Sequence, residues 1–126
     1  MPHLTAHLLQ SQLAGNESTL IGALTDAVVE VYGDWVRDGV SVRLDAVPTG
    51  QWGVGGIAGG DAGPWVVFGI RASVLDRPDA DDIVNALCVK ITDAVARSVS
   101  CHKESIVVEL VPTPAALTSV GGVVGA

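Results

Sequence analysis

Positive charge is scarce in this sequence. It has seven lysine and arginine residues against 14 aspartate and glutamate residues, which gives a net charge of −7. A protein that binds nucleic acid by neutralising phosphates needs a basic face, and this chain cannot assemble one. We therefore exclude a nucleic-acid partner. An anionic ligand would have to be held by Arg37, Arg43, Arg71, Arg77, Lys90, Arg97 or Lys103.

Cysteines and uninterrupted apolar runs are also scarce. The two cysteines, Cys88 and Cys101, lack the spacing of metal ligands, and one possible pair is no disulfide framework. We therefore expect a reduced, cytoplasmic setting. No basic segment followed by an apolar run begins the chain, so we expect no signal peptide. The apolar stretch after Glu109 is interrupted by prolines and glycines, which argues against a membrane span.

Aromatic side chains are few: five in 126 residues, whereas apolar residues make up 48%. This apolar content excludes a disordered chain and suffices for a single domain over residues 1–126. Because the apolar residues are mostly valine, alanine and leucine, we expect closely packed layers of sheet and helix rather than a core of large rings.

Two short stretches of the sequence recur in the same order. Residues 41–49 (SVRLDAVPT) resemble residues 105–113 (SIVVELVPT), 64 positions later. A second pair, LTDAV and ITDAV, lies 67 positions apart. Matches in the same order at nearly the same offset indicate a duplicated unit. We therefore predict a pseudo-repeat of residues 1–60 and 64–126.

Each half has the pattern strand, helix, strand. Alternating apolar residues predict strands, and apolar residues three and four apart predict helices. In the first half we expect strands at 2–9 and 40–47, with a helix between Asn16 and Gly33. In the second half we expect strands at 65–70 and 105–111, with a helix from about Asp79 to Arg97.

Two βαβ units in tandem predict an α+β fold, in which one four-stranded mixed sheet carries both helices on one face. The other face of the sheet is left open. We expect that face to be apolar and to be covered by self-association. Tyr32 and Trp35, at the end of the first helix, are expected in the core or at an interface.

Pro2 offers unusual chemistry. Removal of Met1, which a small second residue normally permits, leaves a free secondary amine. An α-amino group has a pKa of about 7.7–8.0, which an apolar pocket or a nearby arginine lowers. The neutral amine could move a proton on a carbon next to a carbonyl, or form an iminium. Alternatively, Pro2 merely begins a strand, and with Met1 attached its nitrogen is an amide without a basic lone pair.

Other candidate sites are weaker. His3 and His7 share a strand face but lie too far apart to chelate one metal ion without a partner. The glycine-rich residues 53–56 lack the lysine and hydroxyl residue of a phosphate loop. Cys101 and His102 are adjacent in a loop, where side chains rarely form a thiolate pair. We therefore expect no metal site.

Three segments together are similar to the tautomerase superfamily: MPHL at 1–4, SVRL at 41–44 and QWGVGG at 51–56. They resemble the pattern of 4-oxalocrotonate tautomerase, in which the second strand carries an arginine and leads into an aromatic-Gly-x-Gly-Gly turn. In its two-unit length the chain resembles carboxymethyl-hydroxymuconate isomerase, malonate semialdehyde decarboxylase and macrophage migration inhibitory factor. The specific motifs lie within residues 2–56.

This resemblance implies a homotrimer whose sheets face inward around a threefold axis. It implies Pro2 as the catalytic base, Arg43 as the binder of a carboxylate or polariser of a carbonyl, and Trp52 as an apolar wall. Because such pockets are commonly shared between chains, Arg43 and Trp52 would serve a neighbour's Pro2. A planar guanidinium matches a carboxylate in geometry. No metal or organic cofactor is implied.

The sequence departs from the family pattern at the second arginine, where Gln12 stands. Glutamine can hydrogen-bond a carbonyl but cannot neutralise a dicarboxylate. Arg77, just before the second helix, is the candidate replacement, and Arg71 is its competitor; Arg77 could equally be a solvated loop cation. The second half has Val107 at the position matched to Arg43 and no free proline amine, so one active half per chain is expected.

The leading hypothesis is therefore a cofactor-independent tautomerase that interconverts the keto and enol forms of a 2-keto acid with one carboxylate. A decarboxylase, hydratase or dehalogenase of the same superfamily is the enzyme alternative. Hydration is less favoured because no acidic residue near the family site would activate water. A non-catalytic trimer with the same fold is the alternative from another class, and Gln12 and retention of Met1 would favour it.

Overall fold

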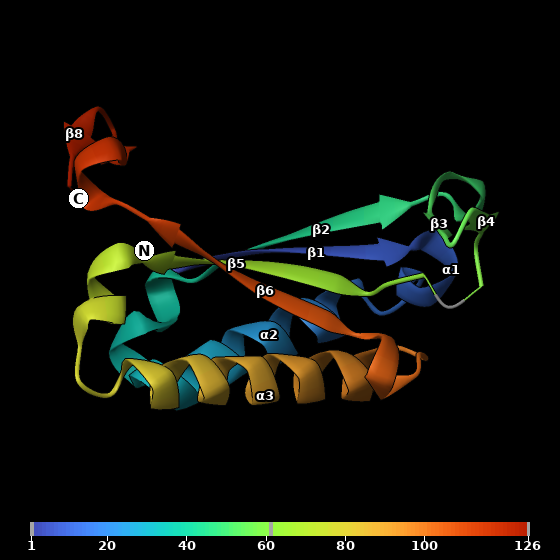
Figure 1. The fold of residues 1–126 in the computed structure, drawn as a ribbon, viewed down its shortest axis with the longest axis horizontal. Helices are drawn as coiled ribbons and strands as arrows, with labels where there is room; N and C mark the ends of the chain where they lie inside the picture. The colour runs from blue at the N-terminus through green and yellow to red at the C-terminus, as the bar shows by residue number, and fades with distance from the viewer. Residues whose placement is uncertain (1, 61, 126) are drawn as a thin grey trace.

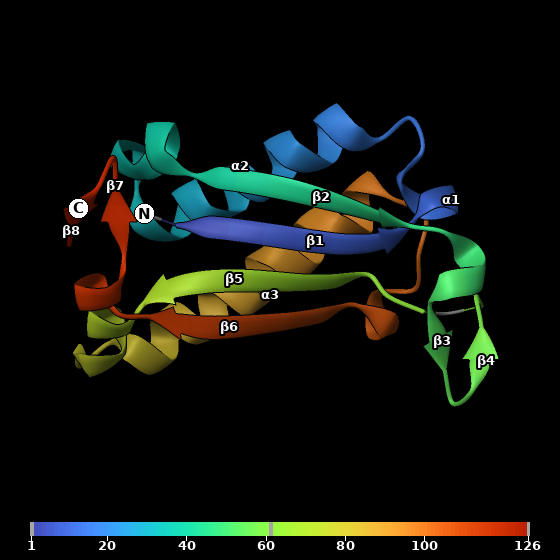
Figure 2. The ribbon, with the colours of Figure 1, turned by 90° about the horizontal axis from the view of Figure 1, so that it is seen from above.

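The computed structural model describes residues 2–60 and 62–125. Its centre is a four-stranded sheet in the order β2-β1-β5-β6. The outer pairs, β1 with β2 and β5 with β6, are parallel, whereas the central pair, β1 with β5, is antiparallel (Figure 2). The four strands are β1 (His3–Leu9), β2 (Ser41–Val47), β5 (Trp65–Arg71) and β6 (Val107–Thr113).

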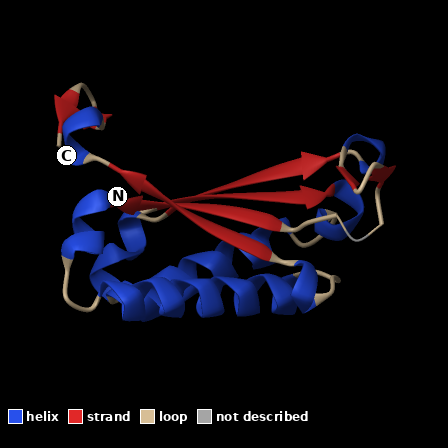
Figure 3. Cartoon of the chain, in the orientation of Figure 1, coloured by secondary structure: helices blue, strands red, loops and turns tan. Residues whose placement is uncertain are grey.

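Both long helices cover the same face of this sheet. Helices α2 (Glu17–Tyr32) and α3 (Ala80–Ser98) lie side by side beneath it (Figures 1 and 3). Alternate residues of the two central strands, β1 and β5, point toward the helices. They are fully buried against the apolar faces of α2 and α3. This confirms the α+β fold with two helices on one face. The buried core includes Leu4, Ala6, Leu8, Val66, Phe68, Ile70, Leu20, Leu24, Leu87 and Ile91.

None of the helices in the described residues is long and apolar enough to cross a bilayer.

Short elements connect the sheet and the two long helices. Each edge strand leads into a short helical turn and a small hairpin. The remaining elements are α1 (Gln10–Leu13), η1 (Asp34–Gly39), η2 (Thr49–Gln51), β3 (Gly53–Val54), β4 (Ile57–Ala58), η3 (Ala72–Asp76), η4 (Lys103–Ser105), η5 (Ala115–Leu117), β7 (Ser119–Val120) and β8 (Val123–Val124).

The two hairpins, β3–β4 and β7–β8, each turn at a pair of adjacent glycines. Gly55 and Gly56 have φ values of 63° and 83°, and Gly121 and Gly122 have 58° and 83°. A side chain rarely adopts this left-handed region, so the Gly-Gly turn requires glycine at both positions. The hairpin β3–β4 turns within residues 51–56, the segment whose sequence resembles an aromatic-Gly-x-Gly-Gly turn.

The fourth strand begins later than predicted. It runs over Val107–Thr113 rather than 105–111, because the amide of Val107 donates to the carbonyl of Pro64 at 3.0 Å and so sets the register. In the same way, the amide of Ser41 donates to the carbonyl of Pro2 at 3.0 Å. The two edge strands therefore correspond at an offset of 66 residues (Ser41 to Val107), not 64.

This register changes which residues correspond in the two halves. Glu109, rather than Val107, takes the place of Arg43 in its strand, and Thr118 takes the place of Trp52. Pro64 takes the place of Pro2, but its nitrogen is bonded to Gly63 and has no basic lone pair. The second half thus lacks counterparts of the arginine, the tryptophan and the terminal proline amine of the first half.

The open face of the sheet is more polar than expected. His3, Thr5 and His7 of β1 lie on it by alternation, and Nδ1 of His7 lies 2.7 Å from Oδ2 of Asp45. Arg43 and Glu109 lie exposed on the two edge strands. Apolar side chains on this face are confined mostly to β5 and β6: Trp65, Val67, Val107 and Val111.

We expect Ile91→Ala to lower the free energy of unfolding by about 2–5 kcal/mol, because its side chain is fully buried and the substitution leaves a cavity between the helices and the sheet. Val89→Ala is the matched control on the same helix. Its side chain is 57% exposed, and a surface change of this kind costs about 0.5 kcal/mol or less. Urea denaturation at one protein concentration measures both; equal losses would contradict the assignment of the core.

Candidate functional site

Pro2 lies at one end of the sheet beside the end of β5. Because β1 pairs antiparallel with β5, His3 lies opposite Gly69, so Pro2 lies near Ile70 and Arg71. Figure 1 shows the start of β1 at the same end as the turns η1 and η3. A cavity of about 420 Å³, which we call the Pro2 cavity, is lined there by Pro2, Tyr32, Trp35, Val36, Gly39, Phe68, Gly69, Ile70, Arg71 and Val74.

Trp35 forms one wall of the Pro2 cavity although its side chain is 79% exposed. Its indole Nε1 donates a hydrogen bond to the carbonyl of Tyr32 at 2.7 Å. Gly33, with φ 109°, ends α2, and a Cβ at this position would lie 3.0 Å from Cδ1 of the indole. Glycine therefore lets the ring lie against the backbone. Trp35 is not a core residue, contrary to one of the two expectations for it.

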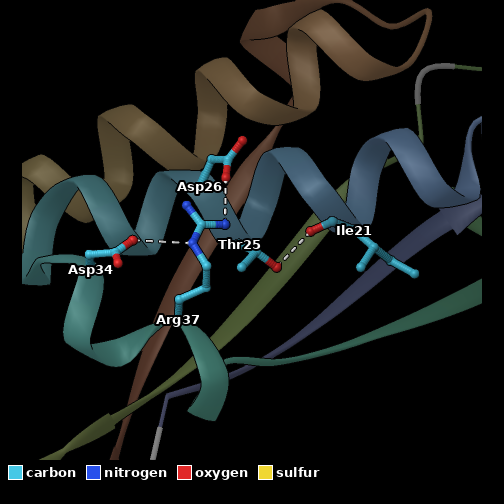
Figure 4. A network of polar contacts seen from close by, with 5 residues as sticks. All are labelled: Ile21, Thr25, Asp26, Asp34 and Arg37. Atoms are coloured by element: carbon cyan, nitrogen blue, oxygen red, sulfur yellow. Dashed lines mark hydrogen bonds and ion pairs between the residues drawn. The ribbon is translucent and has the colours of Figure 1, made fainter.

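Arg37 holds this turn against α2. Its Nε lies 3.4 Å from Asp34 and its Nη1 lies 3.0 Å from Asp26 of α2 (Figure 4). Hydrogen bonds to the two carboxylates raise the pKa of Arg37 further above its ordinary value. One of the seven cations thus fastens η1, which carries Trp35 and Val36, to the helix layer rather than holding a ligand.

Tyr32 forms a second wall, at the last residue of α2. Burial raises the pKa of its hydroxyl, and the charge of Arg77 partly offsets this effect. The hydroxyl is therefore protonated at neutral pH and adds no negative charge to the Pro2 cavity.

The structure brings Arg71, not Arg77, to Pro2. Arg71 ends β5, lines the Pro2 cavity and has its Nη1 shielded from solvent. Arg77 lies exposed beyond η3 and does not line that cavity. Its Nε and Nη2 each lie 3.0 Å from a carboxylate oxygen of Asp79. Arg71 is the only charged side chain among the described residues that line the Pro2 cavity.

Arg43 lies on the open face of the sheet. It is the third residue of β2, opposite Thr5, and its side chain is exposed. It does not line the Pro2 cavity of its own chain.

Trp52 and Gln12 lie at the opposite end of the sheet from Pro2. The seven residues of β1 span about 23 Å at about 3.3 Å per residue, which separates both side chains from Pro2 of the same chain. Trp52 lies against Gly63 and lines a cavity of about 360 Å³ with His7 and Trp65. The Oε1 of Gln12 accepts a hydrogen bond from the amide of Leu9 at 3.0 Å, so this side chain is engaged locally.

The cysteines offer no nucleophile. Burial raises the pKa of the thiols of Cys88 and Cys101, which keeps both protonated at neutral pH. Both cysteines are free. Among the described residues, no group of three His, Cys, Asp or Glu side chains is placed to hold a metal ion.

The sequence interpretation did not identify Tyr32, Trp35 or Phe68 as site residues. The sequence signal that could have found Tyr32 and Trp35 was their position on either side of Gly33, a residue type that commonly ends a helix. Which sheet end this pair reaches depends on strand pairing, which the local sequence does not show.

No model of a protein family matches the sequence, and no curated protein matches it. The structure is similar to several solved structures. F6 fused 4-OT, a wild type asymmetric trimer, has a TM-score of 0.85 and 24% sequence identity, and the match covers 98% of this chain and 95% of that one. Pt0534 inactivated by 2-oxo-3-pentynoate has a TM-score of 0.76 and 20% identity, with 98% and 95% covered.

Malonate semialdehyde decarboxylase has a TM-score of 0.67 and 18% identity, and the match covers 94% of this chain and 89% of that one. At such identities the likeness establishes the fold. The chain therefore has the fold found in fused 4-OT and malonate semialdehyde decarboxylase, as the resemblance of its sequence predicted.

Proposed function

We propose that this protein is a cofactor-independent tautomerase that interconverts the keto and enol forms of a 2-keto acid, with Pro2 as the general base. One observation carries the proposal: Pro2 and Arg71 line a single cavity whose other walls are apolar or aromatic. The proposed chemistry needs a neutral amine and an anion-binding cation in one cavity, and this shared lining supports it.

The apolar walls and the nearby guanidinium both favour the neutral form of the Pro2 amine, since each makes a second cation less stable there. With Met1 removed, the nitrogen takes a proton from the carbon next to the keto group, and the carbonyl oxygen takes a proton from water to give the enol. The hydroxide that remains takes the proton from the Pro2 ammonium and restores the neutral amine. In reverse, the enol oxygen loses its proton and the ammonium of Pro2 protonates the carbon.

Arg71 holds the substrate's carboxylate, because a guanidinium can donate two parallel hydrogen bonds to its oxygens. Arg77 does not line the cavity. No carboxylate occurs among the described residues that line the Pro2 cavity, so no group is placed to activate water for hydration.

The protein functions as a homotrimer of one-domain chains, with residues 1–126 forming each domain. Trp52 lies at the far end of the sheet from Pro2, and Arg43 does not line the Pro2 cavity of its own chain, but both lie on surfaces that a second copy can meet. We propose that Arg43 of the partner subunit polarises the keto group and that Trp52 of the partner subunit closes the cavity. Two solved fused 4-OT structures of this fold are trimers. The free thiols of Cys88 and Cys101 are consistent with a cytoplasmic location.

The state of the Pro2 nitrogen tests this function. We expect intact-mass measurement on protein from its native host to show a chain without Met1. We expect that protein to ketonise phenylenolpyruvate, which ultraviolet absorbance follows. A chain that keeps Met1, or whose Pro2 nitrogen is acylated, and is still active would exclude the amine mechanism. A blocked and inactive chain would support the non-catalytic trimer instead.

A further inference from the structure

The aromatic side chains of this protein are concentrated around Pro2. Only five exist in the sequence, and three of them line the Pro2 cavity. They come from three different elements: Tyr32 from α2, Trp35 from η1 and Phe68 from β5. The aliphatic walls Val36, Ile70 and Val74 lie between them. Aliphatic side chains alone would keep the Pro2 amine neutral, so the proton transfer does not account for aromatic rings in the wall.

Trp35 is the unusual member of this group. An indole that is 79% exposed gains little from folding, yet a hydrogen bond to Tyr32 and the bare backbone of Gly33 hold it in one place. The bonds from Arg37 to Asp26 and Asp34 hold the whole turn (Figure 4). A rigid, exposed ring at the rim of a cavity is placed to stack against a ligand.

Charge in the cavity is one-sided. The guanidinium of Arg71 lies at the end of β5, and no other described lining residue is charged. Arg77 lies outside the cavity and contacts Asp79, and the Tyr32 hydroxyl stays protonated because burial raises its pKa. A second carboxylate on the substrate would therefore lie against aromatic walls without a cation, and an unpaired buried charge is costly.

We propose that Trp35 is the specificity-determining residue of this site and selects 2-keto acids that carry one carboxylate and a flat apolar group, such as an aryl ring, over dicarboxylates. The inference rests on the proposed function. Arg71 binds the carboxylate, the reacting carbon lies at Pro2, and the flat group lies between Trp35, Tyr32 and Phe68. The keto group of a 2-keto acid is adjacent to its carboxylate, so the proposed action of the partner subunit's Arg43 on the keto group leaves the aromatic end without a cation.

The test compares kcat/KM for phenylenolpyruvate and 2-hydroxymuconate. We expect the wild-type protein to prefer phenylenolpyruvate. Trp35→Ala should lower kcat/KM for phenylenolpyruvate about tenfold more than for 2-hydroxymuconate, mainly through KM. A tenfold change corresponds to about 1.4 kcal/mol, which lies within the contribution of an aromatic stack beyond its buried area. Trp35→Phe should restore most of the preference. Val89→Ala, an exposed apolar change on the far side of α3, is the control and should alter neither value.

The outcomes separate this inference from the proposed function. A wild type that prefers 2-hydroxymuconate, or a Trp35→Ala variant with an unchanged ratio, overturns the selectivity but leaves proton transfer by Pro2 intact. A wild type that converts neither acid contradicts the proposed function, and selectivity is then measured by calorimetric binding of phenylpyruvate against 2-oxoglutarate. Sedimentation of Trp35→Ala is a further check: loss of the oligomer would make Trp35 an interface contact and overturn the inference.

Discussion

Replacement of Pro2 by alanine is expected to lower kcat/KM for ketonisation of phenylenolpyruvate by about 10²–10⁴-fold, the range that a positioned general base contributes. The proline ring fixes the nitrogen just before β1. The carbonyl of Pro2 accepts a hydrogen bond from the amide of Ser41 at 3.0 Å. Alanine replaces the secondary amine of proline by a primary amine, which no ring holds in place. Steady-state rates followed by ultraviolet absorbance measure the loss.

The pH profile gives an independent check of the same base. Only the neutral amine accepts a proton, so kcat/KM of the wild type should fall as the pH falls through the pKa of Pro2, and this limb should shift in Pro2→Ala. Pro78→Ala is a suitable control, because Pro78 lies exposed in the loop before α3, outside the Pro2 cavity. Full activity in Pro2→Ala would remove Pro2 from the mechanism and leave the cavity without a base.

Replacement of Arg71 by glutamine is expected to lower kcat/KM by roughly 10–150-fold, because it removes hydrogen bonds to a charged group that contribute about 1.5–3 kcal/mol. The loss should appear mainly in KM, since the carboxylate is bound in the substrate as well as in the transition state. Arg71→Lys should recover only part of it, because an ammonium lacks the planar fork of a guanidinium.

Arg77→Gln is the matched control for Arg71→Gln. It removes the same charge six residues further along the chain, from an exposed side chain paired with Asp79. An exposed pair of this kind contributes about 1 kcal/mol or less to stability, so the fold should be unaffected. We expect kcat/KM to change less than threefold, a range that corresponds to about 0.6 kcal/mol. A large loss in Arg77→Gln with none in Arg71→Gln would show that Arg77 holds the carboxylate instead.

The secondary structure follows largely from local pattern. Leu4, Ala6 and Leu8 alternate toward the helices, and Leu20 and Leu24 mark the buried side of α2. These periodicities depend on neighbours in the sequence, so they predict elements without a structure. The start of β6 does not follow from them: the sequence match began at Ser105, whereas the strand begins at Val107, where its amide meets the carbonyl of Pro64. Register is a property of two strands, not of one.

The residues of the candidate site also differ in how far the sequence alone predicts them. The chemistry of a terminal secondary amine made Pro2 a candidate base, and the motifs that contain Pro2, Arg43 and Trp52 carried the resemblance to the superfamily that assigned it this role. The choice between Arg71 and Arg77 stayed open, since both precede the second helix and both are cations. No local pattern distinguishes an arginine that ends a central strand from one that follows a turn.

Residue order is enough to predict a doubled βαβ chain and to make Pro2 its candidate base. Strand pairing decided the rest. Because β1 and β5 run antiparallel, residues 2 and 71 meet at one end of the sheet, together with the aromatic turn after α2, whereas Trp52 is carried to the other end. Such contacts join segments far apart in the chain and are determined by how the sheet and helices pack, which no short window of sequence contains.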